Sequence, residues 1–166
     1  MGRRLASTLA LLLCGMTAST ASAAPVIEFS RIRQEFRTED SFKRISEFFS
    51  GSENTGNQIV FRTRQDERDG FYFSFRLRSG RGETLPAGTI VLHLYRPGAF
   101  EPTLYTFPLE ARDRRSIEVL VGLTGGDWPD PGARPVAWKL EFLDATNGSL
   151  GSEESFLWEM PDEETE

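Results

Sequence analysis

The chain contains 166 residues, and 25 acidic side chains against 19 basic ones give it a formal net charge of −6. Apolar residues make up 39% and aromatic residues 11%, which supplies the core of one domain and excludes a wholly disordered chain. Cys14 and His93 are the only residues of their types, which excludes zinc clusters, Cys/His catalysis and a disulfide framework. We therefore predict neither a metal nor a cofactor.

Residues 1–24 are predicted to form a cleaved signal peptide. Basic Arg3 and Arg4 precede an apolar stretch, and the small residues Ala21 and Ala23 stand where a signal peptidase requires them. Cleavage near Ala23 or Ala24 would export the protein to the periplasm or the medium and leave no transmembrane anchor. A retained membrane anchor is the alternative. Lipid attachment at Cys14 is disfavoured because the preceding leucine is not small.

Cleavage would also change the charge of the chain. Removing Arg3 and Arg4 leaves 17 basic side chains against the same 25 acidic ones, which is a net charge of −8. The mature chain would contain no cysteine, so its stability would come from its core and its strand ladders.

Residues 25–57 are assigned to the same domain as the rest of the mature chain. A strand is predicted from Val26 to Arg33. From Ser41 to Phe49 the apolar residues lie at positions 42, 45, 48 and 49, a spacing typical of a short helix. A hairpin strand is the alternative there, and residues 50–57 are predicted to form a loop.

Residues 58–160 are predicted to form the core of a β-sandwich. Apolar and polar residues alternate with a period of two, most clearly from Phe71 to Arg78, which is typical of strands with one buried face. Turn sequences such as Asn147-Gly148 separate the runs. Strand centres fall near residues 61, 74, 92, 106, 119, 140 and 157. We expect an antiparallel sandwich of about seven strands, built like an immunoglobulin or fibronectin domain.

Residues 161–166 contain four acidic side chains and are predicted to be a disordered, solvated tail.

The segment Gly122–Pro135 contains the strongest candidate site. Its glycines and prolines predict an irregular but rigid connection between two strands. Asp127, Trp128 and Arg134 are the predicted contact residues for a ligand or partner, because a tryptophan on a loop is a common binding platform. The alternative is that Trp128 folds back and closes the end of the sandwich.

Other candidates carry less weight. His93 lies alone on a strand, and Trp138 and Trp158 fall on core-facing positions. Carboxylates at Asp66, Glu67 and Asp69, or at Glu153 and Glu154, are the candidates for glycosidase chemistry or for binding calcium. Four arginines would form a basic stripe for an anionic polymer if their two strands pair: Arg62, Arg64, Arg76 and Arg78.

The function predicted is that of a non-enzymatic exported binding or interaction module. Its surfaces would be the Gly122–Pro135 segment and an exposed sheet edge, and its partner another envelope protein or a glycan. The alternatives are a carbohydrate-binding accessory domain that uses Trp128 and a small carboxylate-dependent hydrolase. Nucleic acid is excluded as a partner because the chain is acidic.

Overall fold

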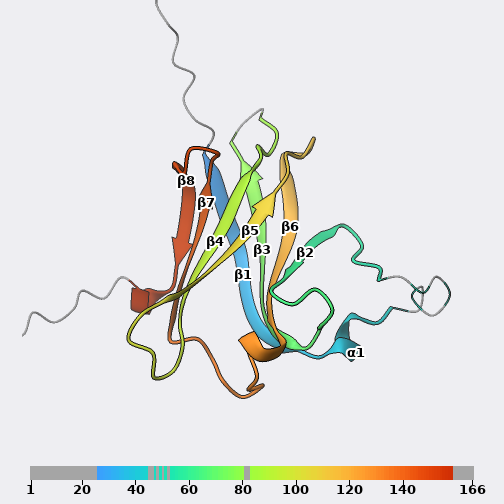
Figure 1. Cartoon of the computed structure of the whole chain (residues 1–166). Helices are drawn as coiled ribbons and strands as arrows, with labels where there is room; N and C mark the ends of the chain where they lie inside the picture. The colour runs from blue at the N-terminus through green and yellow to red at the C-terminus, as the bar shows by residue number, and fades with distance from the viewer. Residues whose placement is uncertain are drawn as a thin grey trace, which may run out of the picture.

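The protein is built from two four-stranded sheets (Figure 1). The computed structural model describes residues 26–44, 47, 49, 51, 53–80 and 83–158. The first sheet has the order β1 (Ile27–Arg37), β3 (Gly70–Ser79), β6 (Ser116–Thr124) and β2 (Gln58–Arg62). The second has the order β5 (Thr103–Leu109), β4 (Gly88–Tyr95), β7 (Ala137–Leu143) and β8 (Ser149–Glu154). The predicted mainly-β, sandwich-like fold is confirmed, with eight strands where about seven were expected.

The core lies between the two sheets and follows the predicted alternation. In β3, Phe71, Phe73 and Phe75 point inward and are at most 1% exposed. Leu92 of β4 and Leu140 of β7 meet them from the second sheet and are fully buried. Because successive side chains of a strand point to opposite faces, one apolar residue in two is enough to fill this interior.

The two lateral sides of the molecule differ. On one side β1 approaches β8 so closely that a Cβ on Gly151 would lie 1.9 Å from the carbonyl oxygen of Ile27. Glycine is therefore required in β8, since any side chain would push the two sheets apart. On the other side, β2 and β5 are the edge strands, and no strand within the described residues joins them.

The arrangement of β2 departs from the predicted antiparallel pattern. It pairs in parallel with β6, with Gln58 opposite Glu118 and Arg62 opposite Gly122. The connection from Thr38 to Asn57 lets the chain leave β1 and return at the far edge of the same sheet. It contains α1 (Glu39–Phe42), which begins two residues before the helix predicted at Ser41. Residues 45, 46 and 48 of that predicted helix lie outside the described residues.

The strand predicted around residue 157 is wrong. The chain ends its pairing with β7 at Glu154 and forms a short 3₁₀ turn, η2 (Phe156–Trp158). Phe156 is 81% exposed, and Trp158 packs on the outer face of the second sheet against His93 and Tyr95 instead of entering the core. By contrast, Trp138 is 9% exposed and faces the core as predicted.

The predicted signal peptide and the predicted acidic tail lie outside the described residues. In the part of the chain that the structure describes, no helix has the length and apolar character needed to cross a bilayer.

Candidate functional site

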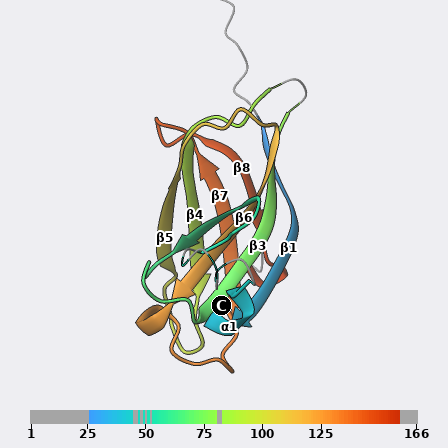
Figure 2. The ribbon, with the colours of Figure 1, turned by 90° about the vertical axis from the view of Figure 1, so that its right-hand side faces the viewer.

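A groove runs along the open side of the sandwich, between the edge strands β2 and β5. Figure 2 looks at this side of the molecule, with β2 in front and β5 in the neighbouring layer. The groove has a volume of about 550 Å³ and is lined by both strands and by Asp127 of the Gly122–Pro135 segment. Its size is that of a small-molecule or peptide site.

Half of the ten residues that line the groove are apolar or aromatic, and the others are Arg62, Thr63, Gln65, Thr106 and Asp127. The rings of Phe61 in β2 and Phe107 in β5 lie 5.7 Å apart and join the two sheets. Leu104, Tyr105 and Pro108 continue the apolar surface along β5, and the Leu104 side chain is 56% exposed. Leu104 is thus an exposed apolar residue on a strand whose outer edge has no neighbour within the described residues, and a partner strand can pair at such an edge.

Asp127 lines one end of the groove, as one of the three predicted contact residues. Its carboxylate accepts a hydrogen bond from the Arg64 Nε at 3.4 Å, and its carbonyl oxygen accepts one from the Arg96 Nη2 at 2.5 Å. The same Arg96 nitrogen donates to the Tyr105 hydroxyl of β5. Arg96 therefore ties the Gly122–Pro135 segment to the groove wall.

Trp128 lies beneath the surface, although its loop position made it a candidate platform. Its side chain is 4% exposed, and its ring centroid lies 4.9 Å from that of Phe71. The Arg96 guanidinium also lies over the indole, 5.6 Å from its ring centroid. The indole thus closes this end of the sandwich and presents no open face to a sugar ring.

Arg134, the third predicted contact residue, lies at the same end of the sandwich. It is exposed and donates hydrogen bonds to the carbonyl oxygens of Pro131 and Ala133, while its guanidinium lies 5.6 Å from the Phe71 ring. Of the three predicted residues, only Asp127 lines the groove.

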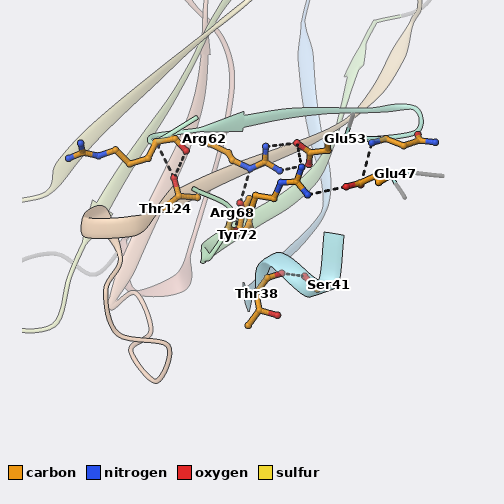
Figure 3. Close-up of polar contacts among 10 residues, drawn as sticks. Thr38, Ser41, Glu47, Glu53, Arg62, Arg68, Tyr72 and Thr124 are labelled. Atoms are coloured by element: carbon orange, nitrogen blue, oxygen red, sulfur yellow. Dashed lines mark hydrogen bonds and ion pairs between the residues drawn. The ribbon is translucent and has the colours of Figure 1, made fainter. Parts of the chain in front are cut away.

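A network of charged residues holds β2 in position (Figure 3). The Arg62 guanidinium donates to both carboxylate oxygens of Glu53, at 2.8 and 2.5 Å, and its Nε donates to the Tyr72 hydroxyl at 3.1 Å. Tyr72 donates in turn to the Arg68 carbonyl oxygen at 2.8 Å, and Arg68 pairs with Glu47 at 3.1 Å. Bidentate arginine–carboxylate pairs are among the strongest polar contacts in proteins.

The network fixes the charge state of its members. The hydrogen bonds from Arg62 lower the pKa of Glu53, and the pair with Glu53 raises the pKa of Arg62. Burial raises the pKa of Tyr72, so its hydroxyl stays protonated at neutral pH. The protonated Tyr72 hydroxyl accepts a hydrogen bond from Arg62 of β2 and donates one to the Arg68 backbone, so it helps to hold β2 in place.

This network was not predicted from the sequence, although the glycine at position 122, inside a predicted strand, indicated that a side chain approaches the backbone there. The Tyr72 ring lies across Gly122 in the neighbouring strand, and a Cβ there would be 2.2 Å from the ring. Phe42 of α1 also packs against Tyr72, with ring centroids 4.9 Å apart. A glycine in a strand interior often marks such a close approach, and this was the available signal.

The predicted basic stripe is not formed as expected. β6 lies between β2 and β3, so the strands that carry Arg62 and Arg76 do not pair. Arg62 is 8% exposed and bound to Glu53, Arg64 contacts Asp127, and Arg76 donates to Glu118. The outer face of the first sheet nevertheless contains three other arginines of β1: Arg31, Arg33 and Arg37.

The remaining candidates occupy separate places. Glu153 and Glu154 lie next to each other in β8 and therefore point to opposite faces, and Asp69 accepts a hydrogen bond from the Glu39 backbone. His93 binds Glu141 across two neighbouring strands, at 2.8 Å. Within the described residues, no three acidic, histidine or cysteine side chains group as metal ligands.

Comparison of the chain with protein-family models, curated proteins and solved structures finds no match.

Proposed function

We propose that the protein is an exported, non-enzymatic binding module whose groove between β2 and β5 takes an extended apolar segment of a partner protein. The observation that carries this proposal is the apolar groove itself, about 550 Å³ in volume and bounded by two edge strands. Each edge strand points part of its backbone N–H and C=O groups away from its single neighbour. A segment added to β5 would use those groups, and its successive side chains would lie beside Leu104 on one face of the sheet and Tyr105 on the other.

The immunoglobulin-like or fibronectin-like class is part of the same proposal. It is supported by the strand order, in which β1, β3 and β6 correspond to strands A, B and E of such a sandwich. The strands β5, β4, β7 and β8 then correspond to C′, C, F and G. β2 occupies the edge position of strand D, although it comes from the connection between A and B and runs parallel to its neighbour.

The non-enzymatic assignment is supported by what lines the groove. Its one carboxylate is that of Asp127, which contacts Arg64, and glycosidase chemistry needs two facing carboxylates. The alternative of a sugar platform at Trp128 has no support from the geometry, because the indole is packed against Phe71 and Arg96.

The test uses a displayed library of random decapeptides selected on the intact protein. Selected peptides should alternate apolar and polar residues and should lose about tenfold or more in affinity for Leu104→Arg. Val136→Arg is the matched control, because Val136 is 49% exposed and does not line the groove. Amide hydrogen exchange should show added protection within Thr103–Leu109 when the peptide binds. Protection confined to other strands, or equal affinity for both variants, would refute the proposal.

A further inference from the structure

The outer face of the first sheet has a β-bulge that brings arginines together. β1 pairs with β3 at Ser30–Arg76 and again at Arg33–Ser74, so two residues of β1 lie opposite Phe75 alone. Of these two, Ile32 packs against the core, while Arg31 is exposed. Residues two apart in a regular strand share a face, so alternation continued from the buried Ile27 and Phe29 would turn both Arg31 and Arg33 toward the core. The bulge shifts the alternation, and both arginines line a hollow on the outer face instead.

Arg31 adopts a backbone conformation that costs free energy. Its φ is +57°, in the left-handed region that residues with a Cβ avoid, and the only other described non-glycine residue with a positive φ is Asn147, in a turn. Asparagine tolerates this region, whereas arginine gains nothing from it locally. Backbone strain of this kind concentrates at functional sites, which favours a functional role for the surface around Arg31.

A hollow of about 190 Å³ lies beside the bulge. Its lining contains three arginines and one acidic residue, together with polar and aromatic residues: Arg31, Arg33, Arg37, Glu118, Gln58, Ser74 and Phe75. Glu118 is held by Arg76 through two hydrogen bonds, at 3.1 and 2.5 Å, and Arg37 is held by Glu35. Among the described residues, Arg31 and Arg33 have no ion-pair partner, so the hollow keeps two uncompensated positive charges.

Two further hollows continue this surface across the sheet. Toward the start of β6, Arg76 and Arg114 line one with Asn57 and Ser116, and it shares Glu118 with the first. Toward α1, a smaller hollow shares Arg37 and Gln58 with the first and adds Arg44 and one acidic side chain, Glu53, which is bound by Arg62. Arginines therefore alternate with amide and hydroxyl side chains along the outer face, in a chain whose net charge is −6.

We propose that this face, defined by Arg31, Arg33, Gln58 and Ser74 and their neighbouring hollows, binds an acidic polysaccharide. Guanidinium groups match carboxylate oxygens, and the interleaved amides and hydroxyls match sugar hydroxyls. A polysaccharide whose charges are separated along its chain could place successive carboxylates in neighbouring hollows. The acidic protein would repel a dense polyanion such as duplex DNA, and the lining offers no exposed ring for base stacking. This site is separate from the groove and does not depend on it.

The probe is polygalacturonate, a linear polysaccharide with a carboxylate on each ring, titrated calorimetrically into the intact protein. We expect binding that weakens as salt is added, and no binding of neutral dextran. Arg33→Gln and Arg31→Gly should each lower the affinity about tenfold. Lys139→Gln removes the same charge from the outer face of the second sheet, next to Glu141, and should change the affinity less than about twofold.

Thermal stability separates loss of binding from loss of fold. Arg31→Gly should raise the melting temperature while it weakens binding, because glycine relieves the strained φ. Asn147→Gly, at the other positive φ, should leave the affinity unchanged. The proposal is overturned if polygalacturonate does not bind, if both arginine variants bind like the wild type, or if duplex DNA or sodium sulfate binds as tightly as the polysaccharide.

Discussion

Replacing Trp128 with alanine tests whether this loop residue is part of the core. The side chain is 4% exposed, and burying an indole removes about 150–250 Å² from water. At about 25 cal/mol/Å², that area corresponds to about 4–6 kcal/mol, and a compact unfolded chain reduces this by roughly a quarter. The indole Nε1 has no hydrogen-bond partner among the residues that the structure describes, so deleting it also removes an unfavourable buried group. We expect Trp128→Ala to lower the free energy of unfolding by about 3 kcal/mol.

The assay is urea unfolding followed by circular dichroism, with thermal unfolding as a second measurement. For a domain of this size, the melting temperature should fall by roughly 10 °C. Phe100→Ala is the control, because Phe100 is 99% exposed and its loss should change stability by less than about 0.5 kcal/mol. Trp128→Phe keeps a ring against Phe71 and should recover most of the loss. An unchanged urea midpoint for Trp128→Ala would refute the packed position and restore the platform interpretation.

Three further predictions concern the first sheet and the loop that precedes β2. Gly122→Ala should destabilise the fold by about 1–3 kcal/mol in urea unfolding, because its methyl group displaces Tyr72, whereas Gly126→Ala has nothing within 4 Å and serves as control. The pKa of Glu53 is lowered in the folded state, so its stabilisation is present above the unfolded-state pKa and is lost as the pH falls through the lower folded value. Glu53→Gln should flatten that acid-side loss of stability in urea titrations at successive pH values, and an unaltered pH profile would contradict the assignment. Arg31→Gly should add about 1 kcal/mol to the free energy of unfolding.

The strands that fill the core could be predicted because their pattern is local. Phe71 to Leu77 alternate with polar residues, and each inward member of that run is at most 1% exposed. The turn at Asn147 and Gly148 was equally visible, since Asn147 has a φ of +64° and Asp144 donates its backbone N–H to the Gly148 carbonyl oxygen. Such features depend on neighbours in sequence, so a single chain reveals them.

The errors occurred where pairing between distant segments decides the structure. β8 is a polar edge strand defined by its hydrogen bonds to β7, so its residues lack apolar alternation, while the apolar run after it carries Phe156 into solvent. Trp128 could be assigned to neither surface nor core, because its partners are distant in sequence: Phe71 lies in β3, and Arg96 directly follows β4. Burial of this kind depends on tertiary packing, which overrides local preference.

β2 links the two proposed binding surfaces. Five residues long, it reaches the basic face through Gln58 at its start and the apolar groove through Phe61 near its end. Its parallel pairing with β6 does not arise from a tight turn, so contacts outside the strand must fix its position. The bidentate pair between Glu53 and Arg62 supplies that constraint, since it joins the preceding loop to the last residue of β2. The network in Figure 3 is thus a structural requirement for both surfaces, which explains why three buried or part-buried hydrogen bonds converge on Arg62 at the end of this short edge strand.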